Sequence, residues 1–260
     1  MDEVLALLGE QEYDARIGRH RSPYMYRGML KSSFRMETSI LRNCKEKWAE
    51  LEGPMLRSFL KYSVQDIPYI RDSEWKQMII GQHYGLPTRL LDWSYSPLVG
   101  LHFATAETSP EKLASHDCVL WKIDTHEINR LLPQNYQDAL KAHSAYHFTV
   151  EMMADIAPNV ADYDRDMAGR SFVMLEPPSI DARIITQYSY FSVVPQGMDD
   201  MEGFLNAATE HTVRYVIDRN LRWQIRDFLD QMGISERITY PGLEGLSQWL
   251  KRHFYVKTEK

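Results

Sequence analysis

The sequence predicts an α+β fold with a central mixed or antiparallel β-sheet flanked by helices. Segments in which apolar residues recur at helical spacing come early in the chain, and short alternating segments typical of strands cluster later. The two kinds of segment do not alternate regularly, which argues against a sheet built from strand–helix–strand units. The 260 residues are enough to bury a substantial core.

The first half of the chain gives the clearest predicted elements. Residues 24–30 have the pattern of a strand, and 36–53 have the pattern of a helix stopped by its final glycine. We expect a helix over 73–85, with a serine as N-cap and a glycine just past its end. A short strand over 89–93 precedes a helix over 96–107, which begins with a capping serine and a proline.

The second half is predicted to contain strands over 118–124, 171–178 and 212–218, one or two strands over 182–194, and helices over 219–233 and 243–254. The pattern weakens over 126–168, which we expect to be an insertion of short helices and mobile loop. The predicted organisation is an N-terminal extension over 1–23, one domain over 24–252 and a tail over 253–260.

Composition excludes several classes of protein. The formal net charge is −6, so a bulk electrostatic attraction to nucleic acid is not expected. The two cysteines, Cys44 and Cys118, favour neither a disulfide framework nor a cysteine-based zinc site, and we expect no metal. The acidic N-terminus does not resemble a signal peptide, and no apolar run is long enough to span a membrane. We therefore expect a cytoplasmic protein without a membrane partner.

Tyr26, Arg27 and Gly28 form the first candidate motif. An arginine on a strand between aromatic and apolar neighbours needs an acidic partner or a ligand. Its planar guanidinium suits phosphate oxygens, and the glycine would let a ligand approach the backbone closely. An ion pair and a phosphate site both remain open for Arg27.

The stretch 81–105 is the most distinctive, because it places hydrogen-bonding and aromatic residues at a turn, a short strand and a helix start. Such positions favour ligand binding. The candidates here are His83, Tyr84, Thr88, Arg89, Asp92, Trp93 and Ser94. In the simpler interpretation the aromatic residues are core, and Arg89 and Asp92 form local salt bridges.

Two polar residues in or beside the later strands, Glu176 and Gln187, complete the set of candidates. Glu176 is either an ordinary solvent-facing residue or a group that binds ribose hydroxyls and stabilises developing positive charge. Gln187 is suited to recognising an amide or a base edge. Dinucleotide-binding, P-loop, zinc-protease and serine-hydrolase motifs are absent from the sequence.

Together these segments resemble the FRG domain family, which is named for its Phe/Tyr-Arg-Gly motif. The resemblance covers about residues 24–252 and rests on segments 26–28, 32–42, 82–104, 183–193 and 233–251. One departure is that Tyr188 and Ser189 stand where we expect a glycine-containing turn. The family name describes a domain without an established chemistry.

A second resemblance, to ADP-ribosyltransferases, implies a split sheet and NAD⁺ as substrate. In many of these enzymes an early strand carries an arginine that contacts NAD⁺. A later strand carries a Ser/Thr-containing motif, and a final strand carries a glutamate that contacts the nicotinamide ribose. Arg27, then residues 88–94, then Glu176 or Gln187 follow the same order here, although no clear final glutamate motif is present.

This resemblance implies a role for each candidate: phosphate binding for Arg27 and Arg89, nicotinamide positioning for His83 or Tyr84, ordering of these groups by Asp92, and ribose binding for Glu176 or Gln187. The acceptor would be protein, nucleic acid or water. The biological role would be that of a bacterial toxin or phage-defence effector, with a neutralising partner.

Two alternatives to an enzyme stay open. The same arginine and aromatic residues would suit a non-catalytic module that binds a nucleotide or single-stranded nucleic acid. Arg27, Arg89, Asp92 and Gln187 would also suit a buried lattice in which they satisfy one another and hold the sheet together.

Overall fold

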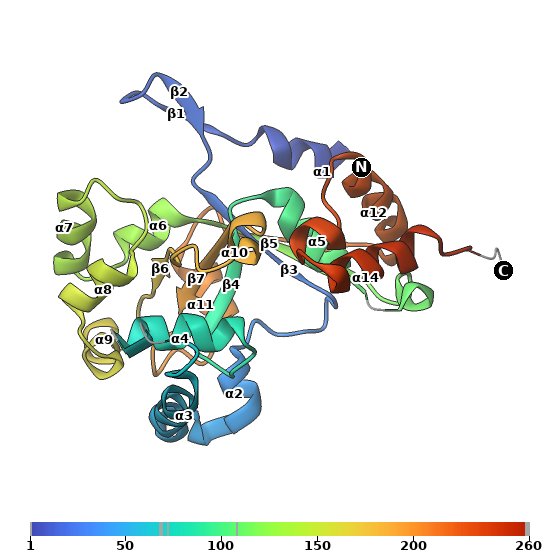
Figure 1. The fold of residues 1–260 in the computed structure, drawn as a ribbon. Helices are drawn as coiled ribbons and strands as arrows, with labels where there is room; N and C mark the ends of the chain where they lie inside the picture. Colours follow the sequence, from blue (N-terminus) through green and yellow to red (C-terminus); the bar gives the residue numbers. More distant parts are fainter. Residues whose placement is uncertain (1, 68–69, 72, 108, 258–260) are drawn as a thin grey trace.

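A computed structural model describes residues 2–67, 70–71, 73–107 and 109–257, and it confirms the predicted α+β class (Figure 1). Within these residues the main sheet has six strands in the order β6-β7-β4-β3-β5-β8, and every neighbouring pair is antiparallel. A separate hairpin of β1 and β2 projects from the N-terminal region (Figure 1). No helix in the described part of the chain combines the length and apolar character needed to cross a bilayer.

The strands are β1 (Glu12–Asp14), β2 (Arg19–Arg21), β3 (Tyr24–Met29), β4 (Leu90–Ser94), β5 (Cys118–Asp124), β6 (Val173–Leu175), β7 (Ser189–Val193) and β8 (Val213–Ile217). The helices of the first half are α1 (Asp2–Ala6), α2 (Ser39–Cys44), α3 (Trp48–Ser63), α4 (Glu74–His83) and α5 (Pro97–Thr105). Those between β5 and β6 are α6 (Thr125–Arg130), α7 (Gln134–Ala142), α8 (Val150–Ile156) and α9 (Val160–Met167). The remaining helices are α10 (Ala182–Thr186), α11 (Met201–Ala208), α12 (Arg222–Gln231), α13 (Glu236–Thr239) and α14 (Leu243–His253).

Several predicted caps are present in the structure. The Ser73 side chain accepts a hydrogen bond from the Lys76 amide at the start of α4, and Ser96 does the same for Val99 at the start of α5. Gly85 follows α4 with φ +84°, a conformation that a glycine adopts without strain. Local sequence therefore fixes both ends of α4 and the start of α5.

Two helical details differ from the prediction. The pattern over 36–53 is not one helix that stops at its glycine, because α3 continues through Gly53 and contains Pro54 in its first turns. The segment 182–194 is not strand throughout, because its first part forms α10. The Asp181 side chain caps α10 by accepting from the Ile184 amide. A run this short fits either period, and the cap favours the helix.

The sheet is divided between β3 and β4. β3 pairs with β5 along its whole length, from Tyr24 opposite Asp124 to Met29 opposite Val119. β4 and β7 are likewise paired from end to end. In contrast, the described residues of β3 and β4 form a single pair, Tyr26 opposite Ser94. The two halves of the sheet, β6-β7-β4 and β3-β5-β8, therefore separate beyond this pair.

Three apolar clusters cover the sheet. One face carries a cluster that spans both halves, with β4, β5 and α11 contributing residues such as Leu91, Trp121 and Leu205. On the opposite face the core is divided in two. α5 and α12 pack on the β3-β5-β8 half, and α4, α7, α8 and α9 pack on the β6-β7-β4 half. Both divisions, in the sheet and in the core, coincide with the separation of β3 and β4.

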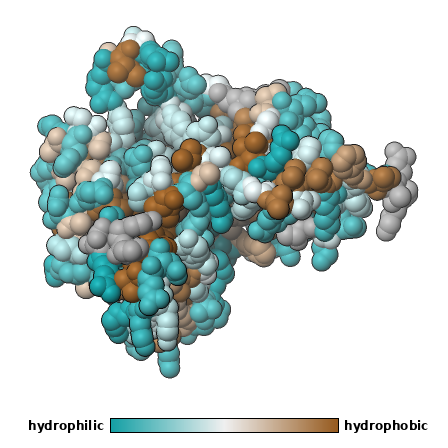
Figure 2. All heavy atoms as spheres, viewed as in Figure 1, coloured by the Kyte–Doolittle hydropathy of each residue, from teal (hydrophilic) through white to brown (hydrophobic). Residues whose placement is uncertain are grey.

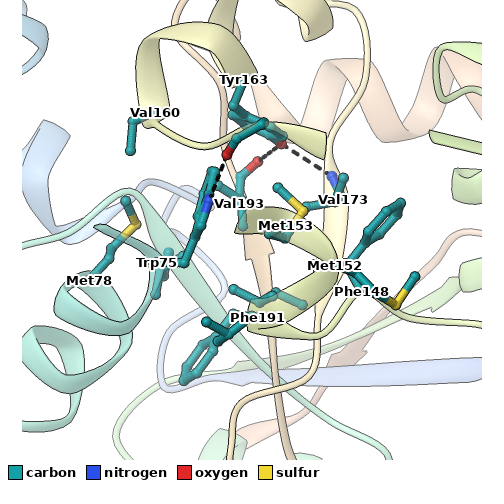
Figure 3. Packing of buried hydrophobic residues seen from close by; sticks show 14 of the residues in the cluster. Trp75, Met78, Phe148, Met152, Met153, Val160, Tyr163, Val173, Phe191 and Val193 are labelled. Atoms are coloured by element: carbon teal, nitrogen blue, oxygen red, sulfur yellow. Dashed lines mark hydrogen bonds between the residues drawn. The ribbon is translucent and has the colours of Figure 1, made fainter. Parts of the chain in front are cut away.

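The segment 126–168, expected to be an insertion of short helices and mobile loop, does contain short helices, α6 to α9, and it supplies much of one core. Its buried residues surround Trp75 of α4 and the strands β6 and β7 (Figure 3). The Tyr163 hydroxyl donates to the Val193 carbonyl at 2.6 Å and accepts from the Val173 amide at 3.2 Å. These helices are therefore part of the core of the fold. The predicted division of the chain into an N-terminal extension, one domain and a C-terminal tail stays a prediction.

Candidate functional site

A cavity of about 770 Å³ lies where β3 and β4 separate. Its walls come from β3, β4, the end of α5, α10, the start of β7, α13 and α14. Six residues predicted from the sequence line it: Arg27, Gly28, Asp92, Trp93, Ser94 and Gln187. The fold thus brings together segments that are far apart in the chain.

Arg27 of β3 brings a largely buried guanidinium to this cavity. Its Nη1 donates to the Asp92 carbonyl at 2.6 Å and lies 3.8 Å from the Asp92 carboxylate. Its Nε is buried and has no hydrogen-bond partner within the described protein. Burial lowers the pKa of Arg27, and the Asp92 carboxylate opposes that shift. A buried guanidinium with an unused donor is suited to an anion.

Asp92 is held by a chain of hydrogen bonds from the 81–94 motif. Gln82 donates from Nε2 to the Asp92 carboxylate at 3.1 Å, and Thr88 donates from Oγ1 to the Gln82 side-chain oxygen at 2.6 Å. The Thr88 amide in turn donates to Ser39 Oγ at 2.9 Å. Thr88 therefore lies outside the cavity and fixes the orientation of the Gln82 amide. Gln82 was missed in the sequence, although it belongs to the motif.

Gly28 lines the cavity, but its lack of a side chain has another cause. A Cβ at this position would lie 2.1 Å from the Gly100 carbonyl oxygen and 2.2 Å from the Ala104 amide nitrogen. Gly100 is itself tight against Tyr26, where a Cβ would lie 2.8 Å from the tyrosine Cβ. The two glycines let α5 pack directly on β3, and this contact shapes one wall of the cavity.

Ser94 and Gln187 connect β4 to the C-terminal helices. Ser94 Oγ donates to the Gln187 carbonyl at 2.7 Å, and the Gln187 side chain donates to the Thr239 carbonyl at 2.8 Å. Gln187 is followed by Tyr188, which has φ +49°. This positive φ occurs where the family pattern leads us to expect a glycine-containing turn.

A buried polar cluster lies behind this wall. His102 lies between Thr239 and Arg226, with each ring nitrogen 2.9 Å from its partner. Burial, followed by the charge of Arg226, lowers the pKa of His102 to about 3, so the ring is neutral. Burial alone would raise the pKa of Glu236, but hydrogen bonds from Arg252 and the charge of Arg226 lower it to about 2.

The remaining walls are aromatic and polar. The Arg183 guanidinium lies over the Tyr240 ring, 5.0 Å from its centroid. Trp93 is buried and donates from Nε1 to Ser192 Oγ at 3.0 Å. Arg183 and Tyr240 were not predicted as site residues, although both belong to segments that carry the family resemblance.

Helix α14 exposes both polar and apolar residues. One face contributes Glu244, Gln248 and Lys251 to the cavity. Elsewhere the first residue of α14, Leu243, and the residue just after its end, Phe254, are 81% and 74% accessible, and hydrophobic surface gathers around α14 in Figure 2. The polar face of this helix forms the part of the cavity wall most distant in sequence from β3.

Arg89 lies away from the cavity. Its guanidinium forms ion pairs with Glu52 and Asp164, and its side chain is 3% exposed. Burial opposes protonation of Arg89, but the hydrogen bonds that it donates to the two carboxylates, together with their charges, outweigh burial and raise the pKa of Arg89. The Trp48 ring also lies against the guanidinium, 5.0 Å from its centroid. Arg89 borders a second cavity of about 640 Å³. Its guanidinium nitrogens already donate hydrogen bonds to Glu52 and Asp164.

The structure does not bring His83, Tyr84 or Glu176 to the cavity. His83 contacts the Asp181 carboxylate at 2.6 Å, and Tyr84 is 66% exposed beside it. Glu176 is exposed just after β6, at the outer edge of the sheet. β6 is separated from β3 by β7 and β4, so a residue following it does not reach Arg27.

A group that fits metal-ligand spacing consists of Asp124, Glu127 and His211. Asp124 caps α6, and Glu127 accepts hydrogen bonds from the backbone and the ring of His211. These contacts account for the cluster without an ion.

A comparison with known protein families matches the part of the chain that carries both predicted motifs, 26–28 and 81–94. The sequence model of the FRG domain matches residues 22–113, which include β3, β4 and the helices between and after them. No curated protein and no solved structure matches the chain. The matched region supplies Arg27, Gly28, Asp92, Trp93 and Ser94, whereas Gln187 and α14 lie outside it. The chain therefore carries an FRG domain over residues 22–113.

Proposed function

We propose that the cavity between β3 and β4 binds NAD⁺ and that the protein cleaves the bond between nicotinamide and ribose, transferring ADP-ribose to an acceptor or to water. The observation that carries the proposal is the convergence of Arg27, Asp92, Ser94 and Gln187 on one cavity at the division of the sheet. These residues come from the three segments that follow the order of the ADP-ribosyltransferase motifs.

Arg27 is the proposed phosphate ligand. Its buried Nε has no hydrogen-bond partner among the described residues. Its Nη1 donates to the Asp92 backbone carbonyl and not to a carboxylate. A phosphate oxygen would satisfy the unused donor and offset the burial that lowers the pKa of Arg27. The guanidinium fork is geometrically suited to such an oxygen.

The size and walls of the cavity suit the rest of a dinucleotide. Its volume of about 770 Å³ lies within the range of roughly 300–1,000 Å³ common for small-molecule sites. Tyr240 and Phe103 offer aromatic surface for a base, and Gln187 and Gln248 offer amides for hydroxyl or base groups.

The test measures NAD⁺ affinity by calorimetry and nicotinamide release with cell lysate present as acceptor. Wild type is expected to bind NAD⁺ and release nicotinamide, and Arg27→Ala is expected to weaken binding at least about tenfold, as loss of a charged hydrogen bond implies. Arg219→Ala, an exposed arginine outside the cavity, is the matched control. Equal behaviour of Arg27→Ala and wild type would refute the proposal.

A second candidate is a non-catalytic nucleotide-binding module in the same cavity. It is favoured by the residues of the cavity wall at the start of β7, where Gln187 and the first strand residue, Ser189, stand instead of a glutamate, and by the position of Glu176 outside the cavity. This alternative predicts NAD⁺ or nucleotide binding that Arg27→Ala weakens, with no nicotinamide formed at any enzyme concentration.

A further inference from the structure

Four carboxylates line the described cavity: Asp92, Glu107, Glu236 and Glu244. Glu236 is neutralised, because Arg226 and Arg252 both donate to it at 2.6–2.8 Å. Asp92 is the carboxylate that faces Arg27, with 3.8 Å between its oxygen and Nη1. Its side chain is 59% exposed and is open to a ligand.

Asp92 is also oriented. Gln82 Nε2 donates to it at 3.1 Å, and the opposite end of that amide accepts from Thr88 Oγ1 at 2.6 Å. Because a carboxylate accepts hydrogen bonds and of the two amide atoms only the nitrogen donates, the Gln82 nitrogen points to Asp92 and its oxygen to Thr88. The Asp92 carbonyl is fixed independently by Arg27 at 2.6 Å. Both the backbone and the side chain of Asp92 are thus held beside the proposed phosphate ligand.

We propose that Asp92 on β4 is the catalytic carboxylate of the site and that Gln82 and Thr88 position it. The inference rests on the proposed NAD⁺ cleavage and names the group that stabilises its transition state. In the ADP-ribosyltransferases that the sequence resembles, a glutamate on a later strand has this role. In this chain the residue of β7 that lines the cavity is Ser189.

The reaction step balances without a further reagent. The bond between ribose C1′ and the nicotinamide nitrogen breaks, and its electron pair leaves with nicotinamide, which becomes neutral. Positive charge develops on C1′ and the ring oxygen, and the Asp92 carboxylate stabilises it while accepting a hydrogen bond from a ribose hydroxyl. The oxygen of water, or of an acceptor, bonds to C1′ and loses its proton to solvent.

The experiment separates binding from cleavage in Asp92→Asn, Gln82→Met and the charge-matched control Asp227→Asn, an exposed residue of α12. Asp92→Asn is expected to lower nicotinamide release at saturating NAD⁺ by about 100-fold or more, with the Kd for NAD⁺ changed less than about threefold. Gln82→Met, a positioning variant, is expected to lower kcat about tenfold. Melting temperatures check that each variant is folded.

The outcomes distinguish this inference from the proposed function. Nicotinamide release by Asp92→Asn at the wild-type rate would overturn the role of Asp92. Binding of NAD⁺ by wild type without any release would overturn it as well and leave a nucleotide-binding module. A wild-type protein that binds no NAD⁺ would refute the proposed function itself.

Discussion

Two arginines from the motifs, Arg27 and Arg89, are in opposite environments. Arg89 is almost completely buried and is paired with two carboxylates, Glu52 and Asp164. Arg27 is also largely buried, but it holds a carbonyl closely, lies farther from its single carboxylate and keeps an unused Nε. Sequence alone makes the two arginines look equivalent. The comparison indicates that an arginine whose donor nitrogens all have partners stabilises the fold, whereas an arginine with an unpaired donor is available to a ligand.

The largest expected effect comes from Arg89. Arg89→Met would leave the buried carboxylate of Glu52, and that of Asp164, without their cation. Removing one member of a buried ion pair typically costs about 3–5 kcal/mol of unfolding free energy. Urea denaturation measures this loss, and a change below about 1 kcal/mol would show that Arg89 is not a brace.

Gly28→Ala tests the contact that shapes the cavity wall. The added Cβ would collide with the backbone of α5, 2.1 Å from the Gly100 carbonyl oxygen. Overpacking of this kind costs about 1–3 kcal/mol. Gly85→Ala is a useful contrast, because its Cβ would meet open space and the strain would come from φ +84° alone. A fully stable Gly28→Ala protein would contradict the packing described for β3 and α5.

Acid should destabilise the polar cluster behind the cavity. The pKa of His102 is lowered to about 3 in the fold by burial and Arg226, while the unfolded residue titrates near 6.5. The unfolded state therefore binds the proton first, and stability falls as pH drops from about 6.5 toward 3. The slope is up to about 1.4 kcal/mol per pH unit for one histidine.

The measurement is the urea stability of wild type and His102→Gln between pH 7 and pH 5. This window lies above the range in which Glu236 loses its contribution, because its pKa is lowered from 4.5 to about 2. His147, whose pKa burial lowers to about 4, contributes to both proteins. Identical slopes in the two proteins would remove His102 from the explanation.

The smallest effect on stability is expected at Arg27. Arg27→Ala removes one hydrogen bond to the Asp92 carbonyl. It also removes a buried charge whose cost of desolvation the Asp92 carboxylate offsets only in part. We expect a change of about 1 kcal/mol or less in unfolding free energy, although the same variant is expected to weaken NAD⁺ binding at least about tenfold. A destabilisation as large as that of Arg89→Met would make Arg27 a second brace and remove the contrast.

Part of the site could be predicted from the sequence because its signals are local. The motif over 81–94 marked Asp92, Trp93 and Ser94, and the tripeptide at 26–28 marked Arg27 and Gly28, all of which line the cavity. Gln82 was missed because a glutamine at a helix end gives no local sign of its partner. Tyr240 and Arg183 were missed because their proximity to β3 depends on how α10, α13 and α14 pack.

The sequence by itself determined the fold class, the positions of most strands, both ends of α4 and the start of α5, because periodicity and capping act within a few residues. Only the tertiary structure decided which arginine is paired and which faces a cavity. The partners of Arg89 are 37 and 75 residues away in the chain, and Arg27 meets Asp92 across 65 residues. Such pairings depend on how the sheet divides and how the helices pack, and no local pattern records them.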